Sequence, residues 1–416
     1  MTFTPTRFAL AAVLLFGAGC KPVDDGSGPR VAVVFDSSDA ALTGDDPYAM
    51  EPDSAALEVS RQDGAWMRVV QLDSTAADTS LNPETLADLT AERLNTGPMH
   101  LPIGADHEGP SVLRIQVLLD RAGFSPGSMD GRWGQNTAKA VYWLQKREAL
   151  PATARVDRAT FEVLARLARA PQRIVTRRAL TAADVEGPFA KLPANIYDKA
   201  KLDAMGYESL TEKLAEAYHV APALLRRLNP GVVIDSLAAG DSLTAPDVAR
   251  AAAAAAVARI AVSGEGNFVH ALDAQDRIVY HFPSTLGASY DPSPDGDYRI
   301  TSVTKNPWWH YQPAILASVD DSEADARIPP GPNNAVGRVW MALSKRHYGI
   351  HGTSAPETIG YAASAGCVRL TNWDVLFLSQ HVKAGTPVNF ANTSGEPNAD
   401  STAARPAARD SAVSTR

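Results

Sequence analysis

The chain of 416 residues is longer than a typical single domain and predicts two to four domains. Hydrophobic residues make up 45% of it, enough for well-packed cores, while 29 glycines and 29 prolines indicate substantial linker. The formal net charge of −8 and the lack of a basic stripe argue against nucleic acid as the main partner, because phosphate binding needs clustered Lys and Arg.

The N-terminus reads as a secretory signal. Arg7 gives a positive flank to a short apolar run that ends in small residues and Cys20, and this run is too short for a permanent membrane span. The small residues before Cys20 resemble a bacterial lipobox, although Gly17 stands where Leu is usual; the alternative is an ordinary signal with an incidental cysteine. The resemblance implies a signal peptide over 1–20 and lipidation of Cys20. With Lys21 next, it implies a periplasmic protein anchored to the outer membrane of a Gram-negative cell.

Residues 21–105 are acidic and rich in Ala, Asp, Ser and Thr. An apolar run at Val31–Phe35 and an alternating stretch at Trp66–Leu72 are possible strands. We interpret the segment as an acidic linker that is at most partly folded.

Residues 106–170 predict a compact helical module. Helical apolar spacing occurs over Val112–Leu119, Thr137–Gln145 and Asp157–Leu164, with a turn-rich loop after the first helix. The order of Ile115-Gln116, Gly123, Asp130-Gly131, Gly134, Thr137, Ala140-Val141, Leu144-Gln145 and Val156-Asp157 resembles the all-α, three-helix peptidoglycan-binding domain. A generic helical hairpin with a glycine loop is the alternative.

A connector over 171–200 precedes a second small module over 201–250. It contains an amphipathic helix at Leu210–Val220, a second helical stretch that ends in Asn229-Pro230, and a Gly-Asp-x-Leu sequence before Pro246. This order resembles a degenerate LysM domain, an α/β module, which implies a second glycan-binding unit. The alanine run that follows predicts a spacer.

From Val257 onward the pattern becomes mainly β. Strands are predicted at Arg259–Val262, Phe268–Leu272, Arg277–Phe282, Asp297–Val303, Val339–Leu343, Tyr348–His351 and Pro387–Phe390. Thr371 is a good N-cap, with Asp374 at the third helical position, for a short helix through Val382. The prediction is therefore a multidomain chain with a C-terminal β-sandwich-like domain over 257–392 and a disordered tail over 393–416.

Cys367 and His351 form the most informative pair. The chain has two cysteines, so Cys367 has no intramolecular disulfide partner if Cys20 is lipidated. Sixteen positions separate the two residues, enough for a strand to end and the chain to return, and Gly360 and Gly366 allow the turns this requires. A neighbouring imidazole is expected to lower the pKa of the thiol, and the backbone at Gly366 to direct amides at an oxyanion.

Ile350-His-Gly-Thr353 followed by Ser364-Ala-Gly-Cys-Val-Arg-Leu370 resembles the signature of the L,D-transpeptidase (YkuD-type) family. The resemblance covers about 257–390 and includes the stretches 292–300 and 328–337. Carried over by position, it implies Cys367 as nucleophile, His351 as base, Gly352 as the carbonyl that orients the imidazole, Gly366 with Cys367 as the oxyanion site, and Arg369 as a substrate contact or loop brace. Thr353 and Ser364 would hydrogen-bond the loop or contact substrate. Many members carry His or Arg where this chain has Ala365, so a substrate contact or an influence on pKa is missing.

The resemblance implies peptidoglycan L,D-transpeptidation. The thiolate would attack the third stem residue of a tetrapeptide, release D-Ala and pass the acyl group to an amine, giving a 3→3 cross-link or an attached protein. Water as acceptor, or a non-catalytic tether between membrane and wall, are the alternatives. No metal-ligand spacing, phosphate loop or nucleotide fingerprint stands out, so no cofactor is expected. The aromatic run at 308–311 is a lid or a core cluster, and the oligomeric state stays open.

Overall fold

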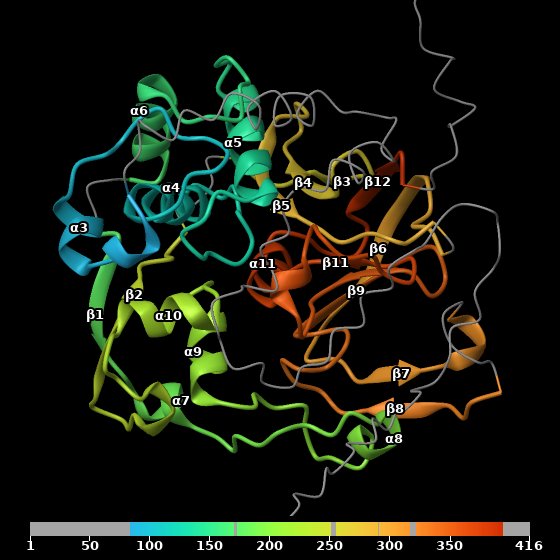
Figure 1. The fold of residues 1–416 in the computed structure, drawn as a ribbon. Helices are drawn as coiled ribbons and strands as arrows, with labels where there is room; N and C mark the ends of the chain where they lie inside the picture. Colours follow the sequence, from blue (N-terminus) through green and yellow to red (C-terminus); the bar gives the residue numbers. More distant parts are fainter. Residues whose placement is uncertain (1–83, 170–172, 251–254, 290, 317–321, 394–416) are drawn as a thin grey trace, which may run out of the picture.

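The computed structural model describes residues 84–169, 173–250, 255–289, 291–316 and 322–393. Cys20, the possible strands at 31–35 and 66–72, and the tail from residue 394 lie outside this part of the chain. The described residues form two helix-rich modules and one β domain (Figure 1). None of the helices in these ranges is both long and apolar enough to cross a bilayer.

The helical module contains the three predicted helices, α4 (Pro110–Arg121), α5 (Gln135–Arg147) and α6 (Arg158–Leu167). Asp157 caps α6 by accepting a 2.8 Å hydrogen bond from the amide of Thr160. Gln116, buried on α4, holds the glycine-rich loop because its Oε1 accepts from Gly131 N at 2.9 Å and its Nε2 donates to Arg132 O at 2.9 Å.

Residues 84–105, the end of the stretch interpreted as an acidic linker that is at most partly folded, pack onto this helical module. They form η2 (Leu86–Asp88) and α3 (Ala91–Thr96). Leu86, Leu89 and Leu94 are buried in the same core as α4, and burial of these apolar side chains is the reason that the segment folds onto it.

The second module, which we call the βααβ module, covers residues 175–246. Its elements are β1 (Val175–Ala179), α7 (Ala182–Val185), α8 (Ile196–Lys199), α9 (Leu210–Ala217), α10 (Pro222–Leu228), η3 (Ile234–Ser236) and β2 (Ser242–Pro246). β1 pairs antiparallel with β2, so the predicted start at residue 201 was wrong. β1 was missed because only Val175 in it is fully buried, which leaves no alternation to detect.

The β domain is built on one mixed sheet of eight strands. Its strands are β3 (Arg259–Ser263), β4 (Phe268–Leu272), β5 (Ile278–Pro283), β6 (Gly296–Lys305), β9 (Val339–Leu343), β10 (Gly349–His351), β11 (Val368–Arg369) and β12 (Pro387–Ala391). The order is β11-β10-β9-β6-β12-β3-β4-β5, with β10/β11 and β12/β3 parallel. All eight strands contribute side chains to one core. The single sheet curls around this core, whereas a sandwich would pack two separate sheets face to face.

Helix α11 (Asn372–Leu378) fills the curled sheet with Val375 and Leu378. Thr371 is its N-cap, as predicted, and accepts a 3.2 Å hydrogen bond from Asp374 N. The helix ends at Leu378, not Val382, and the Asp374 carboxylate accepts from Ser125 Oγ at 2.8 Å instead of closing a capping box. The buried Ser125 of the helical module therefore takes the place of the Thr371 N–H as the donor to Asp374.

A small hairpin of β7 (Trp309–Tyr311) and β8 (Ala326–Ile328) lies apart from the main sheet, with η4 (Pro313–Ile315) between the two strands. It carries most of the aromatic run. Trp308 is 45% exposed and lies under the Arg327 guanidinium, 4.6 Å from its ring centroid, whereas Tyr311 is buried. The aromatic run thus has an exposed side chain at Trp308 and a buried one at Tyr311.

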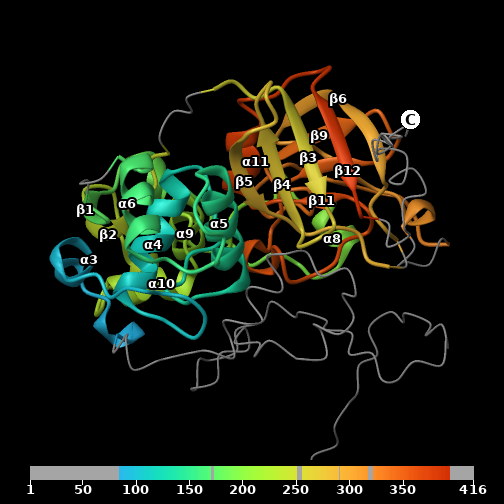
Figure 2. The same cartoon turned by 90° about the horizontal axis from the view of Figure 1, so that it is seen from above.

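The modules pack against each other, with the helical elements on one side and the sheet on the other (Figure 2). A buried ionic network joins them. Arg250 donates to Asp120 of α4 at 2.7 Å and also pairs with Asp374 of α11. The same Asp120 lies 3.0 Å from His219 Nδ1, from the βααβ module. Three parts of the chain therefore meet at one cluster of charges.

Candidate active site

Two adjacent parallel strands carry the predicted site. Ile350 of β10 pairs with Val368 of β11, and His351 pairs with Arg369. Ile350 and Val368 are fully buried in the core. Successive side chains of a strand point to opposite faces, so His351, one residue after Ile350, points away from the core. Cys367, one residue before Val368, lies on that same face and is half-buried.

The imidazole of His351 is held in one orientation. Its Nδ1 lies 2.7 Å from the carbonyl oxygen of Gly352, and its ring stacks on Trp340 at 5.3 Å between centroids. A carbonyl only accepts hydrogen bonds, so Nδ1 carries the proton and Nε2 is the basic nitrogen. Burial, together with the positive charge of Arg369, lowers the pKa of His351 to about 3. The resting imidazole is therefore neutral, as a base requires.

The thiol of Cys367 is also neutral at rest. Burial raises its pKa to about 11, although the Gly349 N–H and Arg369 act in the opposite direction. Its Sγ lies 3.7 Å from the carbonyl oxygen of His347, and no hydrogen bond among the described residues joins it to His351. The expected lowering of the thiol pKa by a neighbouring imidazole is thus wrong for this state, because His351 is uncharged and the thiol points elsewhere.

Hydrogen bonds hold both peptide carbonyls next to the thiol. Ser293 Oγ donates to Gly366 O at 2.8 Å, and Ser364 Oγ donates to Cys367 O at 2.6 Å. In a trans peptide the N–H and C=O point in opposite directions, so the amide of Cys367 points away from Ser293. Gly366 has φ +83°, a conformation that favours glycine. This arrangement leaves the Cys367 amide as a candidate oxyanion donor.

Sequence reasoning did not single out Ser293. It is fully buried, and its Oγ also accepts a 2.9 Å hydrogen bond from Gly287 N. It lies inside the Pro292–Gly296 stretch of the family resemblance, and its neighbouring prolines indicated only a turn.

The remaining predicted residues brace the loop. Thr353 Oγ1 accepts from Ala355 N at 3.1 Å. Arg369 exchanges two backbone hydrogen bonds with Thr285, of 2.9 and 3.0 Å, and contributes its positive charge to the pKa values of both His351 and Cys367. Among the described residues no group of three or more acidic, His or Cys side chains is arranged to hold a metal ion.

This geometry coincides with a known family. Residues 258–390 match the model of the L,D-transpeptidase catalytic domain. The Bacillus licheniformis protein named "Putative L,D-transpeptidase YkuD" is 31% identical over 179 residues, which are 43% of this chain and 92% of that protein. The chain belongs to the L,D-transpeptidase family.

Three further similarities accompany this match. Residues 108–164 match the model described as "Putative peptidoglycan binding domain". The Escherichia coli "Probable L,D-transpeptidase YcfS" is 30% identical over 212 residues, covering 45% of this chain and 61% of that protein. The solved L,D-transpeptidase of Xylanimonas cellulosilytica aligns over 71% of this chain and 99% of its own, at 15% identity and a TM-score of 0.31.

The peptidoglycan-binding domain contacts the loop between His351 and Cys367 of the L,D-transpeptidase domain. Asn136 of α5 donates a 2.8 Å hydrogen bond to Ile359 O, between His351 and Cys367 in the chain. Gly360, with φ +87°, lies so close that a Cβ there would overlap Asn136 Oδ1. This helical domain thus lies directly against the segment that leads to Cys367.

Proposed function

We propose that the protein is a peptidoglycan L,D-transpeptidase with Cys367 as nucleophile and His351 as base. The shared face of the two side chains, with His351 Nε2 unprotonated, is the observation that carries the proposal. The substrate would be a tetrapeptide stem, attacked at the carbonyl of its third residue.

In the first half-reaction the thiol turns from His347 O to His351 Nε2 and gives up its proton. Sulfur attacks the carbonyl carbon, and the Cys367 amide stabilises the oxyanion. The imidazolium then protonates the leaving amine, the peptide C–N bond breaks, and D-Ala departs from a thioester. Because the thiol pKa far exceeds that of the imidazole, the proton stays on sulfur at rest, and the proposal has it move to His351 as sulfur attacks.

In the second half-reaction an acceptor amine attacks the thioester. His351 removes a proton from this amine and returns one to sulfur as the C–S bond breaks. The product is a new amide, either a 3→3 cross-link or a protein attached to the wall. Atoms and protons balance, and the reaction needs no cofactor.

The other modules would hold the enzyme on its polymer. The peptidoglycan-binding domain would bind wall strands in a fixed orientation to Cys367, since it is docked on the catalytic loop. The βααβ module would be a second glycan-binding unit, in line with its LysM resemblance. Lipidation of Cys20 would anchor the protein in the periplasm at the outer membrane of a Gram-negative cell, and the mass of the mature N-terminal peptide tests this.

Muropeptide analysis tests the reaction. Tetrapeptide-rich strands are incubated with the enzyme or with its Cys367→Ala variant. The proposal expects 3→3 dimers and free D-Ala with the enzyme only. Loss of D-Ala without dimers would make water the acceptor. Products that do not depend on Cys367 would overturn the assignment of the nucleophile.

A further inference from the structure

Asn372, the first residue of α11, is buried behind the active site with all its amide groups bonded. Its exposed fraction is 1%. Its Oδ1 accepts from Arg338 N at 2.9 Å, and its Nδ2 donates to Pro332 O at 3.1 Å and to Glu216 Oε2 at 2.9 Å. A flipped amide would place its NH₂ group against the Arg338 N–H and its oxygen against the two acceptor oxygens, so the side chain has one orientation.

This amide lies against Gly352, the residue that orients His351. A Cβ at Gly352 would overlap Asn372 Oδ1, and so would one at Gly337. The Gly352 amide donates to Val339 O at 3.2 Å, and its carbonyl accepts from His351 Nδ1. The Gly352 peptide is therefore confined by Asn372 on one side and by the imidazole on the other.

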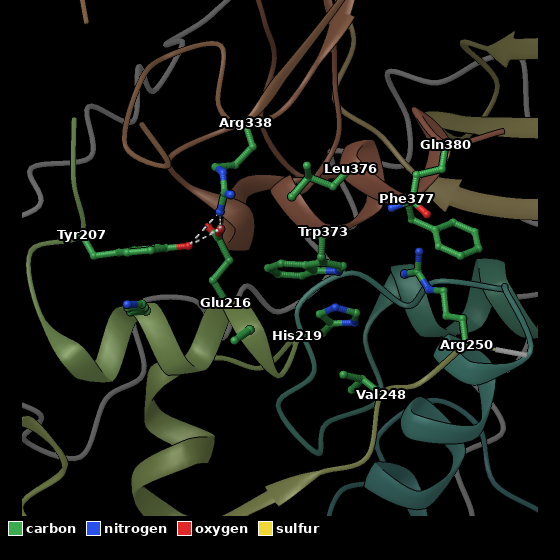
Figure 3. Close-up of a pocket in the computed structure, with 12 residues that line it drawn as sticks. Tyr207, Glu216, His219, Val248, Arg250, Arg338, Trp373, Leu376, Phe377 and Gln380 are labelled. Atoms are coloured by element: carbon green, nitrogen blue, oxygen red, sulfur yellow. Dashed lines mark hydrogen bonds and ion pairs between the residues drawn. The ribbon is translucent and has the colours of Figure 1, made fainter. Parts of the chain in front are cut away.

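Glu216 reaches Asn372 from another module. It lies on α9 of the βααβ module, and Figure 3 shows it pointing from that helix toward Arg338 and Tyr207, beside a cavity of about 510 Å³. Its Oε1 accepts from Tyr207 OH at 2.7 Å, which leaves Oε2 for Asn372. The carboxylate is thus held by its own module while it bonds the catalytic domain.

We infer that Asn372 and Glu216 are positioning residues for His351. Asn372 holds the Gly352 carbonyl in place, that carbonyl keeps the proton on His351 Nδ1, and Glu216 fixes the orientation of Asn372. The βααβ module therefore completes the catalytic site from behind. The consequence for turnover rests on the proposed function, whereas the consequence for the imidazole tautomer does not.

The test combines nitrogen NMR of ¹⁵N-histidine-labelled full-length protein with steady-state kinetics of D-Ala release. The His351 signals are assigned by difference from His351→Gln. We expect the Nδ1–H tautomer alone in the unmodified protein and a mixture of tautomers in Asn372→Ala and Glu216→Ala. In both variants kcat should fall by up to about tenfold, because Gly352 loses the packing that fixes its carbonyl, with KM unchanged. Glu216→Gln, which still offers an oxygen acceptor, should retain both properties.

Glu212→Ala is the matched control. Glu212 lies on the same helix and accepts a 2.7 Å hydrogen bond from Asn333 of the catalytic domain, but it does not contact Asn372. It should leave the tautomer and kcat unchanged. A single Nδ1–H tautomer in Asn372→Ala and Glu216→Ala, or an equal change in Glu212→Ala, would overturn the inference. An unmodified protein without D-Ala release would instead reject the proposed function, with the tautomer result still standing.

Discussion

Ser293 Oγ donates a 2.8 Å hydrogen bond to the carbonyl oxygen of Gly366, the residue before the thiol. The two residues are 73 positions apart in the chain, and the same Oγ accepts from Gly287 N. One buried hydroxyl therefore joins the segment between β5 and β6 to the loop that carries Cys367. This contact orients the peptide whose N–H is the candidate oxyanion donor.

Replacing Ser293 with Ala should lower kcat for D-Ala release by roughly tenfold to a hundredfold, because the Gly366–Cys367 peptide loses its fixed orientation. Two buried backbone groups would lose a partner, so the free energy of unfolding should fall by about 1–3 kcal/mol. Steady-state kinetics and urea unfolding measure the two effects. Ser379→Ala is the control, since it removes a 2.7 Å hydrogen bond to Leu376 O at the C-terminal end of α11. Equal loss of kcat in both variants would contradict the role of Ser293.

The resting thiol should react slowly with alkylating agents at neutral pH. Burial raises the pKa of Cys367 to about 11, and only the thiolate reacts. The rate of iodoacetamide alkylation, followed by mass spectrometry on the Cys367 peptide, should thus keep rising through pH 9 toward pH 11. The urea-unfolded chain, with an ordinary thiol, should level off earlier. A plateau below pH 8 in the folded protein would show a thiolate already formed at rest.

His351→Gln should separate turnover from resting reactivity. Loss of the general base should lower kcat by about 10²- to 10⁴-fold. The alkylation profile of Cys367 should stay the same, because no hydrogen bond joins the thiol and the imidazole in the described structure. Parallel kinetics and alkylation on one preparation check both. A large fall in alkylation would mean that the two groups already form an ion pair before substrate binds.

Removing Arg250 should destabilise the junction of the modules strongly. Burial raises the pKa of Asp120, but Arg250 and His219 together bring it well below the ordinary value. Without Arg250 two buried carboxylates lose their partner, so Arg250→Ala should cost about 3–5 kcal/mol of the free energy of unfolding at pH 7.

The pH dependence of this variant has a definite sign. In the unmodified protein the Asp120 carboxyl has a lower pKa in the folded state than in the unfolded state, where it is near 4. This difference stabilises the fold above about pH 4, and the stabilisation is lost as the pH falls toward the folded-state pKa. In Arg250→Ala only His219 still counters burial, so the pKa of Asp120 should rise from its lowered value, and the stability lost as pH falls from 7 to 3 should be smaller than in the unmodified protein. Denaturant melts at both pH values measure it. Arg178→Ala, which breaks the exposed 3.1 Å pair with Asp247, should change stability by less than about 1 kcal/mol at either pH.

The sequence alone was sufficient where the information is local. The helices α4, α5 and α6 follow from apolar spacing, and seven of the eight strands of the curled sheet from short apolar runs between turns, because such patterns reflect buried faces. The residues of the Cys367 motif could be named because they lie close together in the chain, on one loop and the two strands beside it.

Long-range contacts decided the rest. Ser293 meets Gly366 across 73 positions and Glu216 meets Asn372 across 156, and β1 became recognisable as a strand only through its pairing with β2. The state of the thiol was likewise a tertiary property, since its pKa depends on burial and on which carbonyl it faces. Periodicity and motif depend on neighbours along the chain, whereas these contacts depend on how the curled sheet and the modules pack. The candidate site residues could therefore be proposed from the sequence, whereas their protonation and the contacts that support them depend on the packing.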